Sequence, residues 1–104
     1  MTDSIKIRAR LKNGQPLIKM LINHPMETGR RKDKRTGATI PENYIQKLTC
    51  EHNGKVVLRA NWGKGMAEYP YLSFWLLSGK AGDTIRISWI DNKGGSDSRE
   101  TFIS

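Results

Sequence analysis

The sequence predicts an all-β protein: an immunoglobulin-like antiparallel β-sandwich of about seven strands, folded as the single domain 1–104. Short runs of residues alternate between apolar and polar side chains, which is the period of a half-buried strand. Turn signals separate these runs, and no stretch carries a convincing helical pattern. A chain of 104 residues can bury about two-thirds of its unfolded surface, which is enough for one hydrophobic core.

The first two expected strands form a hairpin. Ile5–Lys12 alternates without a break, with apolar side chains on one face and a row of lysines and arginines on the other. An Asn-Gly pair at positions 13–14 supplies the turn. The second strand, Leu17–Asn23, has an apolar inward face, but Leu17 and Leu21 leave its other face partly apolar as well. This second apolar patch suggests that another surface, such as a partner, covers it.

Five more strands are expected after a long loop. An Asn-Gly pair at positions 53–54 is the strongest hairpin signal in the chain. In the strand that follows it, we expect Val56, Leu58 and Ala60 to share one face. An irregular stretch at 62–70 precedes the last three strands. The five expected strands are Tyr44–His52, Lys55–Asn61, Tyr71–Ser78, Asp83–Asp91 and Ser98–Ile103.

The long loop, residues 24–41, is the segment around which the remaining predictions are organised. Compact domains rarely carry a connection of this length without a functional reason or disorder. Proline holds the preceding residue extended at each end of the loop, and Gly29 and Gly37 permit tight turns. Between the glycines only Asp33 offsets a cluster of cations, namely Arg30, Arg31, Lys32, Lys34 and Arg35. A solvated surface crossover is the alternative to a functional loop.

The net charge of +8 and the pI near 9.9 predict an anionic partner: nucleic acid, an anionic membrane or an acidic protein. No run of about 18 apolar residues exists, so we expect no membrane insertion. The N-terminus lacks the apolar segment of a signal peptide, which by itself indicates the cytoplasm. A small nucleic-acid-binding β domain remains the alternative function, because aromatic residues for base stacking are available at Trp62, Tyr69, Tyr71 and Trp75.

Catalytic and metal chemistry find little support in the sequence. The single cysteine, Cys50, excludes an internal disulfide and a cysteine-cluster metal site. Cys50 shares a strand face with Leu48, which favours an inert buried thiol over a reactive one, and a thiol enzyme is the weaker alternative. His24 and His52 are the only histidines and form no short-spaced ligand pair. We therefore expect no catalytic residue, no metal and no cofactor.

A family signature is present in the long loop: His24-Pro25-Met26-Glu27-Thr28-Gly29, then Arg31-Lys32-Asp33, then Gly37 before Ile40-Pro41. This pattern resembles the SoxZ family. The resemblance continues through Leu48-Thr49-Cys50, Asn53-Gly54, Pro70-Tyr71 with Phe74, and Trp89 with Asp91 before Gly94. The chain departs from the family pattern at Tyr69, where asparagine is usual, in the basic segment 30–37, which is one residue longer, and at 62–67.

The resemblance implies a non-catalytic subunit of the SoxYZ sulfur-carrier complex of thiosulfate oxidation. Such a chain pairs with a SoxY-type subunit, whose cysteine in a C-terminal Gly-Gly-Cys-Gly-Gly arm carries the sulfur intermediates. The heterodimer meets other sulfur-oxidation enzymes transiently in the periplasm, and the signal of the partner exports both chains. Here Gly94-Gly95 is followed by Ser96, which agrees with a subunit that lacks the carrier cysteine. The candidate partner-binding residues are His24, Pro25, Met26, Glu27, Gly29, Arg31, Lys32 and Asp33.

Overall fold

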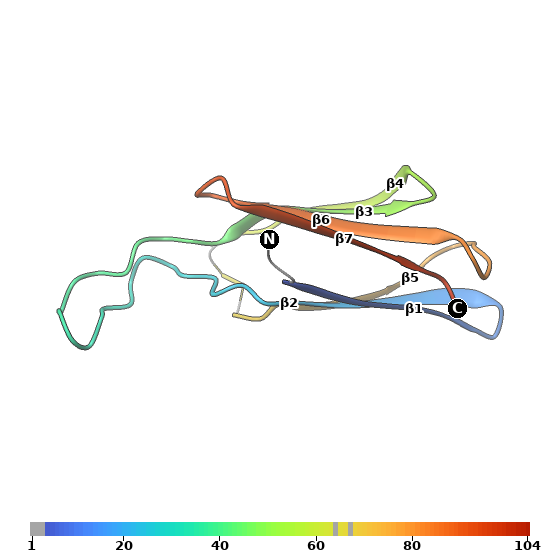
Figure 1. The fold of residues 1–104 in the computed structure, drawn as a ribbon. Coiled ribbons are helices and arrows are strands. Elements are labelled where there is room, and N and C mark those ends of the chain that lie inside the picture. The colour runs from blue at the N-terminus through green and yellow to red at the C-terminus, as the bar shows by residue number, and fades with distance from the viewer. Residues whose placement is uncertain (1–3, 64, 67) are drawn as a thin grey trace.

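The computed structural model describes residues 4–63, 65, 66 and 68–104, in which seven strands form two antiparallel sheets packed face to face (Figure 1). One sheet has the order β1-β2-β5 and the other β4-β3-β6-β7, so the predicted sandwich is confirmed. In constant-type immunoglobulin domains the fourth strand joins the first sheet, whereas β4 here pairs with β3. The strands are β1 (Ile5–Lys12), β2 (Gln15–Ile22), β3 (Ile45–His52), β4 (Lys55–Asn61), β5 (Tyr71–Trp75), β6 (Thr84–Asp91) and β7 (Ser96–Phe102).

Most predicted strand boundaries agree with the observed ones to within two residues, but β5 is shorter than expected. Trp75 of β5 pairs with Leu17 of β2, and the residue after β5, Leu76, meets Pro16. Leu76 still donates its N–H to the Pro16 carbonyl at 3.0 Å, but proline has no N–H to return. The ladder therefore ends there. The predicted irregular stretch 62–70 and the N-terminal segment are described only in part, because residues 1–3, 64 and 67 lie outside the described residues.

A bulge in β4 corrects one prediction. Leu58 lies opposite Cys50 but Val56 lies opposite Glu51, so Val57 is an extra residue between two consecutive partners. The extra residue turns Val56 to the outer face, where 40% of it is exposed. The prediction that Val56 shares a face with Leu58 and Ala60 is therefore wrong, because strict alternation cannot anticipate an inserted residue.

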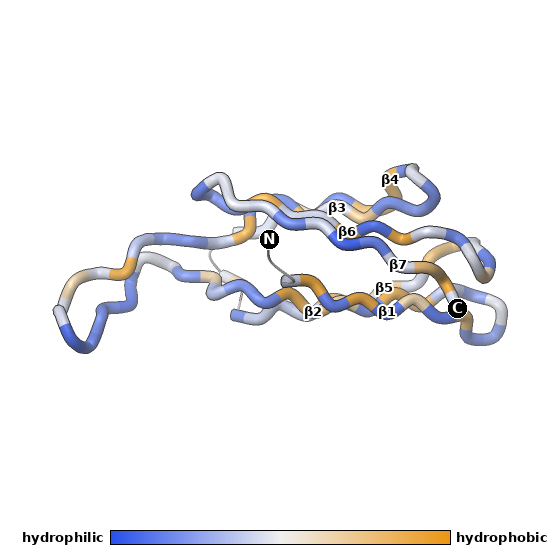
Figure 2. Tube along the Cα trace, in the orientation of Figure 1, coloured by the Kyte–Doolittle hydropathy of each residue, from blue (hydrophilic) through white to orange (hydrophobic). Residues whose placement is uncertain are grey.

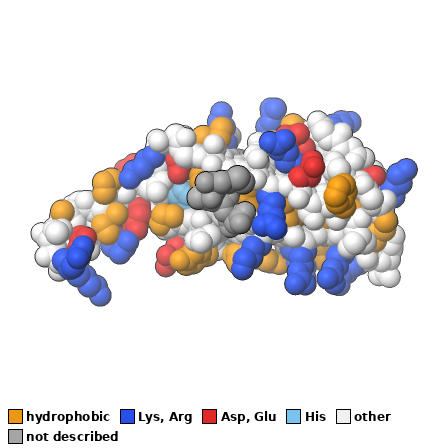
Figure 3. All heavy atoms as spheres, viewed as in Figure 1, with side chains coloured by type: hydrophobic (Ala, Val, Ile, Leu, Met, Phe, Trp, Pro, Cys, Tyr) orange, Lys and Arg blue, Asp and Glu red, His pale blue; other side chains and the backbone are white. Residues whose placement is uncertain are grey.

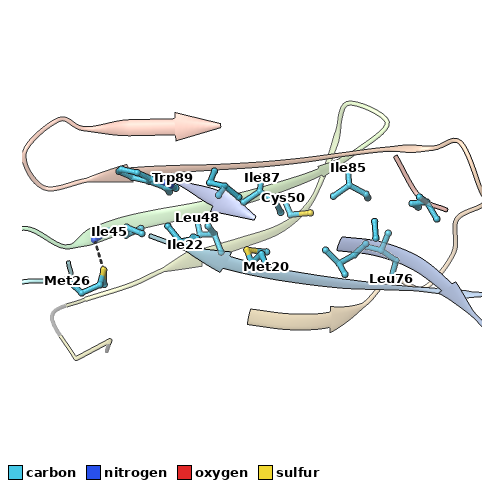
Figure 4. Close-up of a cluster of buried hydrophobic side chains, with 14 residues drawn as sticks. Met20, Ile22, Met26, Ile45, Leu48, Cys50, Leu76, Ile85, Ile87 and Trp89 are labelled. Carbon is cyan, nitrogen blue, oxygen red and sulfur yellow. Dashed lines mark hydrogen bonds between the residues drawn. The ribbon is translucent and has the colours of Figure 1, made fainter. Parts of the chain in front are cut away.

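The core lies between the two sheets and consists mainly of β-branched and long aliphatic side chains. Hydrophobic and hydrophilic positions alternate along the strands, as Figure 2 shows. The inward faces predicted for β1, β2 and β6 are confirmed, and Cys50 and Leu48 point into the same core (Figure 4). The residues with no more than 2% exposure include Ile5, Ile18, Met20, Ile22, Ile45, Leu48, Cys50, Ile85, Ile87 and Ile103.

The two sides of the sandwich differ. On one side the C-terminal residue closes the gap, because Leu11 N–H donates to the Ser104 carbonyl and Ser104 N–H to the Ala9 carbonyl, both at 2.9 Å. On the other side, no backbone hydrogen bond joins β4 to β5 within the described part of the chain. A groove of about 570 Å³ runs there, lined by residues that include Val57, Phe74 and Leu77.

Candidate protein-docking site

The loop at 24–41, with Glu42 and Asn43, projects from the sandwich as an arm of two extended limbs (Figure 1). The arm contributes to an elongated molecule that measures 52 × 23 × 23 Å. At its base, Glu27 and Asn43 exchange two backbone hydrogen bonds of 2.7 and 3.0 Å. Further out, Ile40 N–H donates to the Arg31 carbonyl at 2.8 Å. The arm therefore holds its shape through backbone pairing, since its limbs lie beyond the core and are mostly hydrophilic (Figure 2).

One carboxylate organises the tip of the arm. Asp33 Oδ1 accepts the Arg35 N–H at 2.8 Å, and the Asp33 carbonyl accepts the Gly37 N–H at the same distance. Gly37 has a φ of +72°, a conformation that glycine adopts without strain. The resulting tight turn leaves Lys34 and Arg35 exposed to solvent at the far end of the molecule.

A surface ion pair stiffens the limb that leaves the sandwich. Arg31 Nε donates to Glu27 Oε1 at 3.1 Å, and Arg31 Nη2 contacts the other carboxylate oxygen. Mainly through this hydrogen bond, the guanidinium holds the pKa of Glu27 below its ordinary value, and the carboxylate raises the pKa of Arg31. Because 66% of the Arg31 side chain stays exposed, the ion pair orients the limb but contributes little to the stability of the fold.

Two buried residues anchor the base of the arm. Met26 adopts a φ of +51° and is 4% exposed, and its sulfur accepts the Ile45 N–H at 3.4 Å (Figure 4). The His24 ring is 3% exposed and its Nδ1 accepts the Met26 N–H at 3.0 Å. An imidazole nitrogen that accepts a hydrogen bond carries no proton, so the ring is neutral and its proton is on Nε2.

His24 also contacts the last residue of β6 through the proton on Nε2. This proton is donated to Asp91 Oδ2 at 3.1 Å, and Asp91 is 7% exposed. The other oxygen of Asp91 accepts the backbone N–H groups of Lys93 at 3.0 Å and Gly95 at 2.7 Å. The Trp89 and His24 rings pack in a T-shaped arrangement with a centroid distance of 5.1 Å. We call His24, Met26 and Asp91 the latch, because together they fix the arm to the sandwich.

The candidate partner-binding residues occupy buried, half-buried and exposed positions. His24 and Met26 are buried in the latch, where they hold the arm and reach no other molecule. Gly29 is required by the backbone: its φ is +85°, and a Cβ there would lie 2.7 Å from Glu42 Cγ. Pro25, Arg31 and Lys32 are exposed, while Glu27 and Asp33 are half-buried.

Two residues that support the arm were not among the predicted site residues. Asp91 closes the latch, and Asn92 accepts the Tyr44 N–H at 2.8 Å and donates to the Glu42 carbonyl at 3.1 Å. Asp91 is the last residue of β6 and Asn92 follows it. Their partners in and beside the arm are 48 to 67 positions away, so no local pattern connects them to the loop. The only hint in the sequence is that Asp91 belongs to the family signature.

Cys50 has the environment of a structural thiol. It is 0% exposed in the middle of β3, and burial, with a smaller contribution from Glu51, raises its pKa from 9.0 to about 12. His52 pairs instead with Asp83 at 2.8 Å, at the end of the sandwich away from the arm. Within the described ranges, no three histidine, cysteine or acidic side chains gather in a way that could hold a metal ion, and no helix is long and apolar enough to cross a bilayer.

The fold and the arm define a class: a seven-stranded immunoglobulin-like sandwich with a latched, cationic arm. The family model described as sulphur oxidation protein SoxZ matches residues 5–101, and the chain belongs to this family. A superoxide reductase (neelaredoxin) from Ignicoccus hospitalis has a similar structure, with a TM-score of 0.63 and 20% identity over 97% of this chain and 78% of the other. At that identity the likeness shows the fold alone. No curated protein matches the chain.

Proposed function

We propose that the chain is the non-catalytic subunit of a periplasmic sulfur-carrier heterodimer. A SoxY-type partner, whose signal exports both chains, bears the carrier cysteine, and this subunit docks and steers the complex. The observation that carries the proposal is the latched arm, which places exposed cations beyond the core of a chain that belongs to a sulfur-oxidation family. The burial of the only thiol supports the assignment of sulfur transfer to the partner.

The arm suits encounter with acidic proteins. Its exposed cations lie far from the sandwich, where they raise the rate at which an oppositely charged surface approaches. Other sulfur-oxidation enzymes that visit the carrier complex transiently are the partners that such steering would serve. The buried latch keeps the two limbs in one orientation, so that the charges are presented without a large ordering cost upon contact.

The first prediction tests whether a partner is obligatory. Expressed alone, the chain is expected to aggregate or self-associate, because the outer face of β2 and β5 exposes apolar side chains. Co-expression with the SoxY-type subunit should convert it into a 1:1 complex, measured by light scattering after size exclusion. A stable monomer that does not bind the partner would contradict the proposal.

The second prediction concerns the arm. Arg31→Glu with Lys32→Glu is expected to change the melting temperature little, because exposed ion pairs contribute about 1 kcal/mol or less. The association rate with an acidic sulfur-oxidation enzyme should fall severalfold in stopped-flow measurements, and the difference should shrink in high salt.

Its matched control is Lys47→Glu with Arg59→Glu, which makes the same change in net charge on the exposed outer face of the four-stranded sheet. The control should associate at nearly the unaltered rate. Equal slowing by both pairs would mean that total charge, rather than the arm, steers the encounter. A large fall in melting temperature of the arm variant would show that Arg31 and Lys32 support the fold.

One observation favours the alternative of a nucleic-acid-binding domain. Tyr71 and Trp75 are exposed on the same sheet face as the cations of β1, so aromatic rings and positive charges share a surface. Binding of this kind weakens steeply with salt. Retention of single-stranded oligonucleotides at low salt, and release at moderate salt, would support this alternative.

A further inference from the structure

The outer face of the three-stranded sheet carries charged side chains of one sign, all of them lysine or arginine. Its side chains form three neighbouring columns that the strand pairing aligns into rows. Figure 3 shows basic and hydrophobic side chains along the lower rim of the molecule, where this sheet lies. We call it the basic sheet face, and its members are Lys6, Arg8, Arg10 and Lys12 on β1, Leu17, Lys19 and Leu21 on β2, and Tyr71, Ser73 and Trp75 on β5.

Within the described residues, the five cations of the basic sheet face are not neutralised by ion pairs with acidic side chains. Arg8 lies directly opposite Lys19, and like charges in that position destabilise a sheet. The free chain therefore bears an electrostatic cost that an acidic surface would remove.

Apolar side chains lie beside these charges. Leu21 is 38% exposed, Tyr71 57% and Trp75 51%. Leu21 lies on β2 beside Lys6, and the two aromatic rings lie on β5, one strand further from β1. A shallow hollow of about 230 Å³ is lined on this face by Lys6, Arg8, Lys19, Leu21 and Tyr71. The central row of the face, Arg8, Lys19 and Ser73, lies between two rows that contain apolar side chains. Exposed aromatic side chains and arginine are enriched in protein–protein interfaces.

The outer face of the four-stranded sheet provides an internal comparison. Arg86 lies opposite Glu51 on one side and Glu100 on the other, so its charge is balanced across the strands. Serine and threonine occupy the next row of that face, at Thr49, Ser88 and Ser98. That surface therefore has the mixed charges of a solvated face, and the basic sheet face does not.

We infer that the SoxY-type subunit docks on the basic sheet face, and that its matching surface places acidic side chains opposite the cations and apolar side chains opposite the leucines and aromatic rings. This inference rests on the proposed function and adds the location and chemistry of the contact. The cations of this face would attract a phosphate backbone as well as an acidic protein, but the aliphatic side chains of Leu17 and Leu21 fit an apolar protein surface and have no counterpart in base stacking. The groove between β4 and β5 is also apolar but holds a single lysine, Lys55, and no comparable charge.

The test is the Kd of the complex between the full chain and the SoxY-type subunit, measured by calorimetry in moderate salt. Arg8→Gln with Lys19→Gln removes two facing charges, so the variant should be at least as stable as the unaltered chain, yet its Kd should rise about tenfold or more. Leu21→Ser with Tyr71→Ser should weaken the complex by a similar factor. The control pair Lys47→Gln and Arg59→Gln, on the opposite face, should change the Kd less than about twofold.

Each outcome is decisive. Absence of any complex with the unaltered chain would overturn the proposed function and this inference with it. A complex that tolerates both face variants but is lost with Val57→Glu would leave the function intact and place the partner in the β4–β5 groove. Retention of a single-stranded oligonucleotide that disappears with the Arg8 and Lys19 changes, while the complex is unaffected, would assign this face to nucleic acid. Weakening by the face variants alone, with an unchanged or higher melting temperature, is the expected result.

Discussion

Asp91→Ala is expected to lower the free energy of unfolding by about 3 kcal/mol, because it leaves the buried His24 N–H and two backbone N–H groups without their acceptor. For a domain of this size, that corresponds to a fall in melting temperature of about 10–20 °C. Thermal unfolding followed by circular dichroism measures the effect directly. The variant should also expose the arm to proteolysis, since the latch no longer holds its base.

Substitutions of His24 separate the two hydrogen bonds of the latch. His24→Asn can still accept the Met26 N–H near the position of Nδ1 but cannot reach Asp91, whereas His24→Gln can reach Asp91 but leaves Met26 unpaired. Both should cost less than Asp91→Ala. The second histidine–aspartate pair provides the control: 17% of the His52 side chain is exposed, so His52→Ala should have a smaller effect. Equal losses in the two pairs would show that the latch has no special role.

The alternation of apolar and polar residues predicted the strands of the sandwich, because this period depends only on neighbouring residues in the sequence. In β1 and β6 each side chain points where its position in the pattern places it, and Asn13-Gly14 and Asn53-Gly54 form the turns expected of them, with positive φ at all four residues. The apolar patch at Leu17 and Leu21 was also readable, because two leucines occupied positions that a solvated strand would give to polar residues.

The features that escaped prediction depend on contacts between distant residues. The limbs of the arm pair through backbone groups, so their side chains show no alternation that predicts the pairing. The latch joins His24 to Asp91 across 67 positions. The sequence shows prolines at both ends of the loop and glycines within it, but it does not show that the buried side chains of His24 and Met26 fix the base of the arm to the sandwich.

The latch and the basic sheet face have related consequences for the proposed heterodimer. The arm is connected to β2, which is also the middle strand of the basic sheet face. A subunit seated on that face would therefore lie on the sheet from which the arm extends. The arm would then be available to contact the partner or the enzymes that visit it. A variant with a loosened latch should weaken both of these contacts of the arm, although the side chains of the basic sheet face are unchanged.

The second large effect concerns the location of the sulfur. Cys50 is the only thiol of this chain, and it is fully buried in a strand that pairs on both sides. Its raised pKa, about 12, leaves almost no thiolate at neutral pH, and the thiolate is the nucleophile. Iodoacetamide should therefore label Cys50 slowly in the native complex and rapidly after unfolding.

The same pKa shift predicts a dependence of stability on pH. The thiol of the unfolded chain ionises near its ordinary pKa of 9.0, while the folded one stays protonated until about pH 12. Between these values the unfolded state binds fewer protons, so the contribution of Cys50 to stability is complete below pH 9 and decreases as the pH rises. Cys50→Ser should remove this component of the pH dependence and should cost about 1–3 kcal/mol at neutral pH, because the buried hydroxyl lacks a hydrogen-bond partner.

Measurements of pathway turnover can show which of the two chains carries the sulfur. A thiol that carries sulfur must enter the active sites of several enzymes, and a residue in the middle of a strand cannot do so without breaking its ladder. Thiosulfate-dependent turnover of the reconstituted pathway should therefore survive Cys50→Ser and should be abolished when the carrier cysteine of the SoxY-type partner is replaced by serine. Intact-mass spectra of the cycled complex should place every added sulfur on the partner chain. A sulfur adduct on this chain that disappears together with turnover in Cys50→Ser would reverse the assignment, because it would require Cys50 to leave the core during each cycle.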